Sequence, residues 1–293
     1  MPRALVNTGM ELEYDTFGSP DDPALLLIMG FTAQLTAWDE AFCRILAGGG
    51  RFVIRFDNRD CGLSTKLDGQ VADVPAVMAA AFADQPAPAV PYTLSDMAAD
   101  AIGLLDHLGI ERAHIMGASM GGMIAQTVAI EHPDRVRSLI SIMSQPGEVE
   151  VGQPTAEAAA AIFSPPPTTR QEYIDSAPKW MVWQSKKYRD EAKVKQNAAR
   201  DFDRSFYPEG ATRQLAAIYA SGRRTEMLKV LDTPTLIIHG RDDELITPSG
   251  GTRTAELIPG ANLLLMADMG HDMPEQLWPV ITDAILSHTR HAG

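Results

Sequence analysis

A serine between glycines is the residue of this sequence best suited to covalent chemistry. Gly117-Ala118-Ser119-Met120-Gly121 matches the pattern G-x-S-x-G, follows an apolar run and precedes a helical pattern at Gly121–Glu131. A strand–turn–helix setting of this kind raises the serine hydroxyl above the sheet edge. The glycines remove the Cβ atoms that would clash in so tight a turn. We therefore predict that Ser119 is a nucleophile, the alternative being a glycine-rich turn with an incidental serine.

A serine hydroxyl needs a base within hydrogen-bond reach, and the base needs an orienting acid. Of the seven histidines, only His271 lies in a loop after the last predicted strand, in Met269-Gly270-His271-Asp272. Active sites of α/β proteins form at the carboxyl ends of strands. The other histidines fall in predicted helices or strands, beside Pro133 or in the tail. The sequence therefore predicts His271 as the base.

The orienting acid should follow an earlier strand end. The strand at 235–239 is followed by Gly240-Arg241-Asp242-Asp243-Glu244. A turn at Gly240 lets the third residue after it point back toward the site, which favours Asp243 over Asp242. Glu244 is expected to be solvated, and a plain acidic surface run is the alternative for all three. Glu148 is a more remote candidate acid.

An oxyanion formed during acyl transfer needs two hydrogen-bond donors. The backbone N–H of Met120, directly after the nucleophile, is one candidate, and the helix that begins there adds its positive dipole end. The N–H of Phe31, in the loop after the strand at 24–29, is the other. We expect the Phe31 ring to line the substrate pocket.

Short apolar runs separated by helical patterns are expected to position these residues. Such an alternation predicts an α/β fold with a mostly parallel sheet that helices cover on both faces. The predicted helices outside the segment described next are Asp96–Leu108 and Gly121–Glu131. The predicted buried strands are Ala24–Met29, Arg51–Phe56, His114–Met116, Leu139–Met143, Thr235–His239 and Leu263–Met266.

The alternation stops between Pro146 and Leu231, a stretch called the inserted segment below. It holds 13 basic and 11 acidic residues (net +2), which leaves 12 basic and 27 acidic residues (net −15) elsewhere, and it carries nine of the 19 aromatic residues. We predict a helical cap at 146–231, with helices at 169–185, 190–206 and 211–228, over a core of 1–145 and 232–293. The alternative is extra core helices.

Trp180 and Trp183 are three residues apart and share a helical face, so we predict them as pocket residues. Packing within the cap is the alternative for both.

Composition excludes several other classes of protein. The 293 residues carry a net charge of −13, which disfavours nucleic acid and anionic membranes as partners. No apolar run reaches the roughly 18 residues of a membrane helix. Cys43 and Cys61 match no metal spacing, and no G-x-G-x-x-G opens a dinucleotide site, so we expect two packed thiols, no metal and no cofactor. The N-terminus lacks the apolar core of a signal peptide, so we expect a cytoplasmic protein.

These residues resemble the α/β-hydrolase superfamily over nearly the whole chain. The resemblance rests on Gly117–Gly121, Asp243 and His271 in this order, and on the D-x-R-G-x-G-x-S-like stretch Asp57–Ser64, in which Asp60 stands where glycine is usual. Many members carry His-Gly before the oxyanion donor, where this chain has Met29-Gly30. The stretches 17–30 and 57–65 are similar to the carboxylesterase branch that includes aclacinomycin methylesterase.

The resemblance implies a serine hydrolase that cleaves carboxylic esters through an acyl-enzyme, with a methyl ester of a bulky apolar or aromatic small molecule as one candidate substrate. It leaves the substrate and the oligomeric state open. Alternatives within enzymes are a cofactor-free perhydrolase and a C–C bond hydrolase. A ligand-binding receptor with a hydrolase fold and little turnover is an alternative from a different class, since fold alone does not settle function.

Overall fold

A single sheet of eight strands runs through the computed structural model, which describes residues 1–292. Its order is β1-β2-β4-β3-β5-β6-β7-β8; β2 pairs antiparallel with β1 and β4, and the other neighbours pair parallel. The expected α/β fold with a mostly parallel sheet is therefore confirmed. The strands are β1 (Arg3–Leu5), β2 (Glu11–Phe17), β3 (Ala24–Ile28), β4 (Phe52–Phe56), β5 (Ala113–Ala118), β6 (Val136–Ile142), β7 (Thr235–Gly240) and β8 (Asn262–Met266).

Sequence patterns predicted the strands at the two edges of the sheet least accurately. β1 and β2 were not predicted, because β1 is only three residues long and β2 carries Glu11, Glu13 and Asp15 among its apolar residues. The prediction that 263–266 is a buried strand is wrong in its burial. β8 lies at the sheet edge, with Leu263 and Leu265 about 40% exposed (39% and 42%).

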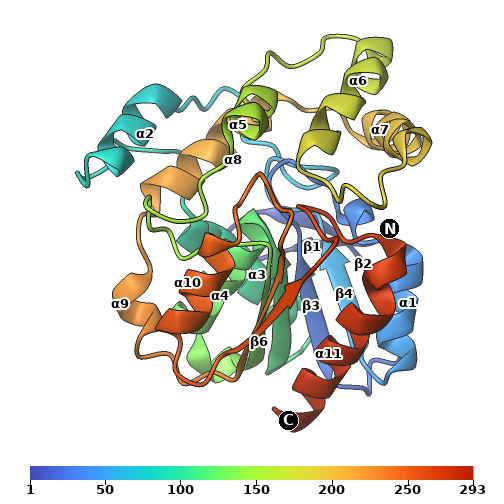
Figure 1. The fold of residues 1–293 in the computed structure, drawn as a ribbon. Coiled ribbons are helices and arrows are strands. Elements are labelled where there is room, and N and C mark those ends of the chain that lie inside the picture. The colour runs from blue at the N-terminus through green and yellow to red at the C-terminus, as the bar shows by residue number, and fades with distance from the viewer. Residues whose placement is uncertain (293) are drawn as a thin grey trace.

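Helices cover both faces of the sheet, and each face has its own apolar core (Figure 1). Successive strand side chains point to opposite faces, so Leu26 and Ile28 of β3 join one core while Leu25 and Leu27 join the other. This two-sided burial explains why the central strands appear in the sequence as unbroken apolar runs. The first face packs against α3 (Leu94–His107), α4 (Met120–Glu131) and α10 (Ser249–Leu257), and the second against α1 (Glu40–Gly48) and α11 (Trp278–His291).

The inserted segment is helical and lies beyond the carboxyl ends of the parallel strands (Figure 1). The helix predicted at 169–185 is shorter and breaks at Pro178, and the one predicted at 211–228 is two helices separated by Gly222, whose φ is 60°. α2 (Val74–Phe82) comes from outside the segment, and its Phe82 ring lies 5.9 Å from that of Tyr219. The segment contains α5 (Ala156–Ile162), α6 (Arg170–Ser176), the 3₁₀ helix η3 (Ala177–Val182), α7 (Glu191–Arg204), α8 (Glu209–Ala220) and α9 (Thr225–Leu228).

Three short 3₁₀ helices complete the described elements: η1 (Leu35–Ala37), η2 (Pro133–Arg135) and η4 (Glu275–Leu277). Among residues 1–292, none of the helices combines the length and the apolar character that crossing a membrane requires.

Candidate active site

Ser119 lies in a sterically demanding turn between β5 and α4. Its φ of 58° and ψ of −123° are in a region that L-residues rarely adopt. A Cβ atom on Gly117 would lie 1.9 Å from the Gly121 carbonyl oxygen, and one on Gly121 would lie 2.0 Å from that of Ile28. Glycine is therefore required at both positions for the backbone to pass so closely. The carbonyl of Ser119 accepts from Gly122 N at 2.9 Å and starts α4.

His271 and Asp243 meet although 28 residues separate them. His271 Nδ1 lies 2.8 Å from Asp243 Oδ2, and the other carboxylate oxygen, Oδ1, accepts the N–H groups of Leu245 and Ile246, each at 2.9 Å. A Cβ on Gly240 would lie 2.2 Å from the carbonyl oxygen of Met269, so the end of β7 and the histidine loop are in direct contact. The structure thus places the carboxylate of Asp243 against the histidine.

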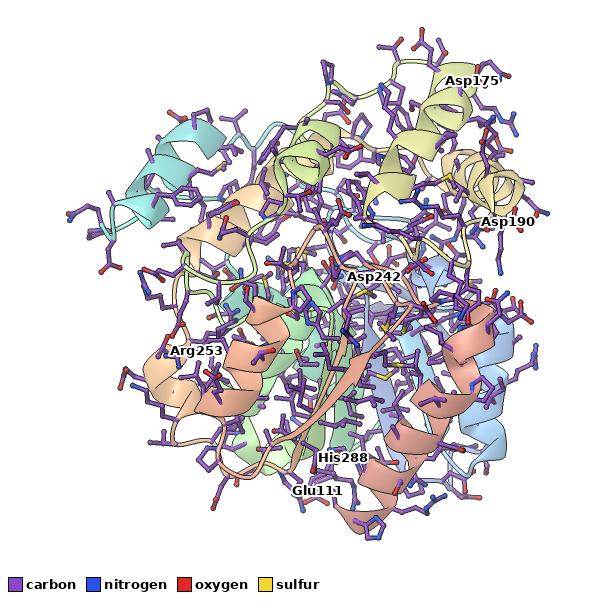
Figure 2. The ribbon with its side chains drawn as sticks, viewed as in Figure 1. Glu111, Asp175, Asp190, Asp242, Arg253 and His288 are labelled. Carbon is purple, nitrogen blue, oxygen red and sulfur yellow. The ribbon has the colours of Figure 1, made fainter. Side chains whose placement is uncertain are left out.

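The two acidic residues beside Asp243 lie in different surroundings. Asp242 N–H donates to Met269 O at 3.0 Å, and Figure 2 shows Asp242 where the inserted segment meets the sheet, with Glu111 and His288 at the opposite end. Glu244, which was expected to be solvated, is partly exposed. Its side chain is 22% exposed and pairs at 2.7 Å with Lys186 of the inserted segment.

The environment of Asp243 favours its charged form. Burial alone would raise the pKa of this carboxyl. Interaction with His271 and hydrogen bonds from His239 and His271 outweigh the burial, so the pKa lies below its ordinary value. His239 is fully buried; its Nε2 lies 2.8 Å from Ile246 O and 3.4 Å from Asp243 Oδ2. Sequence analysis assigned His239 only to a strand end and missed its contact with the acid.

The inserted segment touches the histidine loop through its backbone. His271 N–H donates to the Trp183 carbonyl at 2.6 Å, and a Cβ on Gly270 would lie 2.4 Å from that same oxygen. Asp272 accepts from Ser185 N at 2.9 Å and from Gly270 N at 3.3 Å. Burial raises the pKa of Asp272, and these N–H donors counteract part of the increase. Asp272 is a second residue that sequence analysis did not single out.

One large cavity brings the predicted site residues together. Its volume is about 1910 Å³, and Ser119, Met120, His271 and Phe31 all contribute to its wall. Within the described residues, Ser119 Oγ and His271 are not hydrogen-bonded to each other. Contacts of this kind are often long before substrate binds and then shorten.

The predicted pocket tryptophans serve two purposes. Trp180 and Trp183 both line the cavity. The Trp180 ring also packs edge-on against Tyr173 at 5.3 Å, and Tyr173 contacts the stacked pair Phe202 and Phe206. Lining the pocket and packing within the inserted segment are therefore compatible for Trp180.

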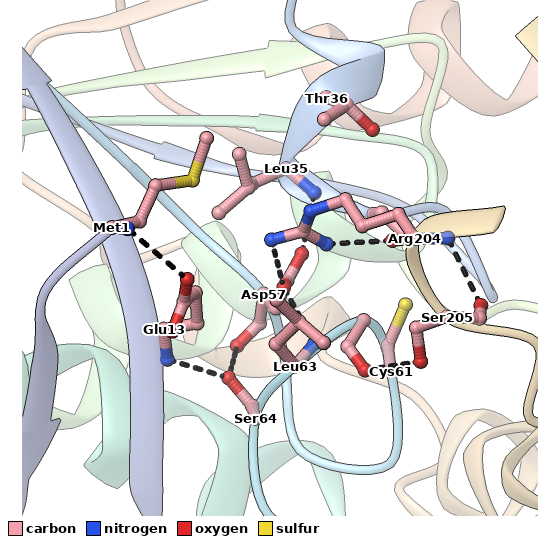
Figure 3. A network of polar contacts seen from close by, with 12 residues as sticks. Met1, Glu13, Leu35, Thr36, Asp57, Cys61, Leu63, Ser64, Arg204 and Ser205 are labelled. Atoms are coloured by element: carbon pink, nitrogen blue, oxygen red, sulfur yellow. Dashed lines mark hydrogen bonds and ion pairs between the residues drawn. The ribbon is translucent and has the colours of Figure 1, made fainter. Parts of the chain in front are cut away.

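Two arginine–aspartate pairs, in which both aspartates are buried, fasten the inserted segment to the loop at 57–64. Arg204 Nη2 lies 2.8 Å from Asp57 Oδ2, and Asp57 also accepts the N–H groups of Leu35 and Leu63 (Figure 3). Arg213 donates through two nitrogens to Asp60, each at 2.8 Å. Asp60 has a φ of 63°, the conformation that suits the glycine usual at this position. Aspartate at this position therefore provides a partner for the inserted segment.

The alternative acid and the two cysteines lie away from the histidine–aspartate pair and have other surroundings. Glu148, the remote alternative acid, is bonded to Arg253 Nε at 2.8 Å and to Thr225 Oγ1 at 2.7 Å, and not to a histidine. Cys43 and Cys61 are both buried and unpaired, and burial raises the pKa of each thiol. Residues 1–292 contain no cluster of three or more His, Cys, Asp or Glu side chains arranged to hold a metal ion.

Comparison with known proteins places the chain in a family. Residues 23–276 match the family model described as the alpha/beta hydrolase fold. The chain is 26% identical to rhodomycin D methylesterase of Streptomyces peucetius, covering 99% of this chain and 98% of the relative. It is 27% identical to 2-hydroxymuconate semialdehyde hydrolase of Pseudomonas putida, covering 86% and 89%. The enol-lactonase of Burkholderia xenovorans LB400 superposes with a TM-score of 0.75 at 24% identity, covering 99% and 100% of the two chains.

The chain belongs to the α/β hydrolase fold family. The predictions of this fold and of an enzyme that hydrolyses esters are confirmed at this level.

Proposed function

We propose that the protein hydrolyses a carboxylic ester through an acyl-enzyme on Ser119. The support is that Ser119, at the head of α4, and His271 face one cavity, and that Asp243 is hydrogen-bonded to His271 from behind. In this proposal His271 is the general base, Asp243 orients it, and the N–H groups of Met120 and Phe31 form the oxyanion hole. The N–H of Met120 is the first of α4, so no partner within the helix can occupy it.

The reaction then proceeds in two half-reactions. His271 Nε2 takes the proton of Ser119 Oγ as the oxygen attacks the ester carbonyl, and the carbonyl oxygen becomes the oxyanion. The tetrahedral intermediate collapses, the C–O bond to the alcohol breaks, and His271 returns the proton to the leaving alcohol oxygen. Water repeats the sequence on the acyl-enzyme and releases the acid. The charge that Asp243 retains stabilises the imidazolium formed in each half-reaction.

We propose further that residues 146–231 act as a cap and that the substrate is a methyl ester of a bulky apolar or aromatic small molecule. A cavity of about 1910 Å³ exceeds the roughly 300–1000 Å³ of common small-molecule sites. Aromatic and thioether side chains line much of it, including Phe31, Met123, Met143, Trp180, Trp183 and Phe206. The name of the relative that is similar over the full chain specifies a methylesterase. Such a lining suits a multi-ring substrate better than a short acyl chain.

The direct test is Ser119→Ala. Loss of a catalytic serine costs on the order of 10⁶ in kcat, so turnover of methyl and p-nitrophenyl esters should disappear. A fluorophosphonate should label the wild-type protein at Ser119, as located by peptide mass spectrometry, and should not label the variant. Ester turnover by Ser119→Ala at the wild-type rate would exclude the proposal.

A second candidate is hydrolysis of a C–C bond in a vinylogous diketone. It is favoured by similarity to a relative whose name specifies a semialdehyde as the substrate. Parallel kcat/KM measurements on aromatic methyl esters and on 2-hydroxymuconate semialdehyde separate the two. Higher kcat/KM on the semialdehyde would make the C–C reaction the main one.

A further inference from the structure

Gln214 belongs to α8 of the inserted segment, and its side chain lies between two loops of the core. Its side chain is fully buried. Oε1 accepts the N–H of Thr32 at 2.8 Å, and Nε2 donates to the carbonyl oxygen of Arg59 at 3.0 Å. One amide therefore uses both its acceptor and its donor to connect the loop after β3 with the loop at 57–64.

These bonds occupy the N–H of Thr32 but leave that of Phe31 free among the described residues. The N–H of Thr32 is taken by Gln214, and that of Ala33 donates to Gly30 O at 3.3 Å. The N–H of Phe31 makes no hydrogen bond to any residue in the described range 1–292, and Phe31 lines the cavity. Thr32 has a φ of 56°, an uncommon conformation that needs support from its surroundings. Gln214 provides such support at the residue next to the proposed donor.

The loop at 30–32 is also close enough to the nucleophile for small movements to matter. A Cβ on Gly30 would lie 2.9 Å from Ser119 Cβ. Two core residues hold carbonyl oxygens of this stretch: Asn58 Nδ2 bonds to Met29 O at 2.8 Å and Cys61 Sγ contacts Thr32 O at 3.2 Å. Neither of them holds an N–H. Gln214 thus holds the Phe31–Thr32 peptide, which directly follows the Gly30–Phe31 peptide that carries the N–H of Phe31.

We propose that Gln214 is a positioning residue for the oxyanion hole, so that the inserted segment organises the catalytic backbone as well as enclosing the substrate. This inference rests on the proposed acyl-transfer function. Gln214 touches neither Ser119 nor His271 among its hydrogen bonds; it acts through Thr32 on the N–H of Phe31. Its effect must therefore appear in the stabilisation of a tetrahedral oxyanion and not in the binding of a planar carbonyl.

The test compares two ligands of wild-type and Gln214→Met protein. Phenylboronic acid adds to a serine hydroxyl and forms a tetrahedral anion, whereas benzamide keeps its planar carbonyl. Methionine preserves the chain length and removes both hydrogen bonds. We expect phenylboronic acid to bind roughly 10- to 100-fold more weakly to the variant, less than the 10²–10³ lost when a whole donor is deleted. Benzamide affinity should change by less than about 3-fold, and kcat should fall in parallel with boronate affinity while KM changes little.

Arg213→Gln is the matched control, because Arg213 precedes Gln214 on α8 and bonds to Asp60 instead of the β3 loop. We expect it to lower the melting temperature more than Gln214→Met does, with a nearly unchanged ratio of boronate to benzamide affinity. An equal loss of the ratio in both variants would overturn the proposal, because general loosening of α8 would then be the cause. An unchanged ratio in Gln214→Met would overturn it as well.

Gln214→Lys carries the test if the methionine variant does not fold. Its ammonium can still donate to the Arg59 carbonyl but cannot accept the N–H of Thr32, so the ratio should fall at least about 3-fold, and an unchanged ratio overturns the proposal. Failure of the underlying function has a different signature. If Ser119→Ala kept full ester turnover, the acyl-enzyme would be wrong, whereas an inactive Ser119→Ala with a normal Gln214 variant removes only the role of Gln214.

Discussion

The turn that carries Ser119 and the inserted segment that faces it are held in place by different kinds of interaction. The turn depends on backbone packing, since Cβ atoms at Gly117 and Gly121 would collide with carbonyl oxygens at about 2 Å (1.9 and 2.0 Å). The inserted segment is fastened by charges and amides from distant parts of the chain, above all Arg204 to Asp57 and Arg213 to Asp60. Ser119, the proposed nucleophile, is positioned by short-range steric limits, and the inserted segment by long-range polar contacts.

This difference has a consequence for function. Steric limits on the turn allow almost no variation, which suits a residue whose oxygen must be placed within tenths of an ångström. Polar contacts from the segment can be exchanged for others as long as each buried charge keeps a partner. Five expectations test this contrast, from the largest effect to the smallest.

Asp243→Asn should produce the largest effect of the five, a loss of kcat. An amide cannot hold the imidazole in the required tautomer or stabilise its charge, and the analogous change in a serine triad costs about 10⁴ in kcat. Asp242→Asn should change kcat by less than about 10-fold, because Asp242 contacts the histidine loop through its backbone N–H, which donates to the Met269 carbonyl. Initial rates on one aromatic methyl ester are sufficient, and the reverse ranking would transfer the orienting role to Asp242.

Asp60→Asn should destabilise the attachment of the inserted segment. Asparagine keeps the volume and tolerates positive φ, but it leaves Arg213 buried without a counter-charge, which costs about 3–5 kcal/mol of unfolding free energy. Urea unfolding at pH 7 measures the loss. Ester kcat should fall far less than in Asp243→Asn; a loss of kcat as large as in that variant would contradict the separation of the two regions.

The effect of Asp60→Asn should also depend on pH. Burial opposes the ionisation of Asp60, but hydrogen bonds from Arg213 and the backbone of Leu67 outweigh it, so the pKa of Asp60 lies below its ordinary value. A carboxyl with a lowered pKa stabilises the folded state above the pKa of the unfolded chain, about 4 for aspartate. This stabilisation is lost as pH falls through the lower folded-state pKa. The stability difference between wild type and variant should be constant above about pH 5 and shrink below about pH 4.

Replacing Trp180 and Trp183 by alanine tests whether their rings contact the substrate in the cavity. If their rings contact the acyl group, kcat/KM on a bulky aromatic methyl ester should fall relative to methyl acetate by about 10- to 100-fold, which corresponds to roughly 1–3 kcal/mol. An equal loss on both esters together with a lower melting temperature would assign the pair to packing against Tyr173 and its neighbours.

Lys186→Ala should have the smallest effect. Its pair with Glu244 connects the inserted segment to the core at 2.7 Å, yet the lysine side chain is 58% exposed. Exposed pairs contribute little to stability, because water and salt screen them. Urea unfolding should show a loss well below that of Asp60→Asn, and added salt should reduce it further. A loss as large as that of Asp60→Asn would mean that exposed pairs, and not only the buried ones, hold the segment.

Much of the candidate site could be predicted from the sequence where the determinants are local. The position of Ser119 follows from glycine spacing between a strand and a helix, and the structure shows that turn. The central strands were predicted because burial on both faces leaves a continuous apolar run. β1, β2 and the exposure of β8 were not, because edge strands carry mixed residues whose burial depends on neighbours far away in the chain.

The remaining features were decided by tertiary structure. The family motif shows Asp60 only as a departure from glycine, and nothing in its neighbourhood in the sequence indicates that Arg213, 153 residues later, completes a buried pair. The contacts of Gln214 and His239 could not be predicted either. A glutamine in a helix and a histidine in a strand carry no local signal, and only the fold brings their partners close. The sequence by itself determined the turn at Ser119 and the central strands, because steric and periodic constraints act between neighbours. Only the folded chain determined which buried polar groups meet, because each such group must find its partner wherever the fold places one.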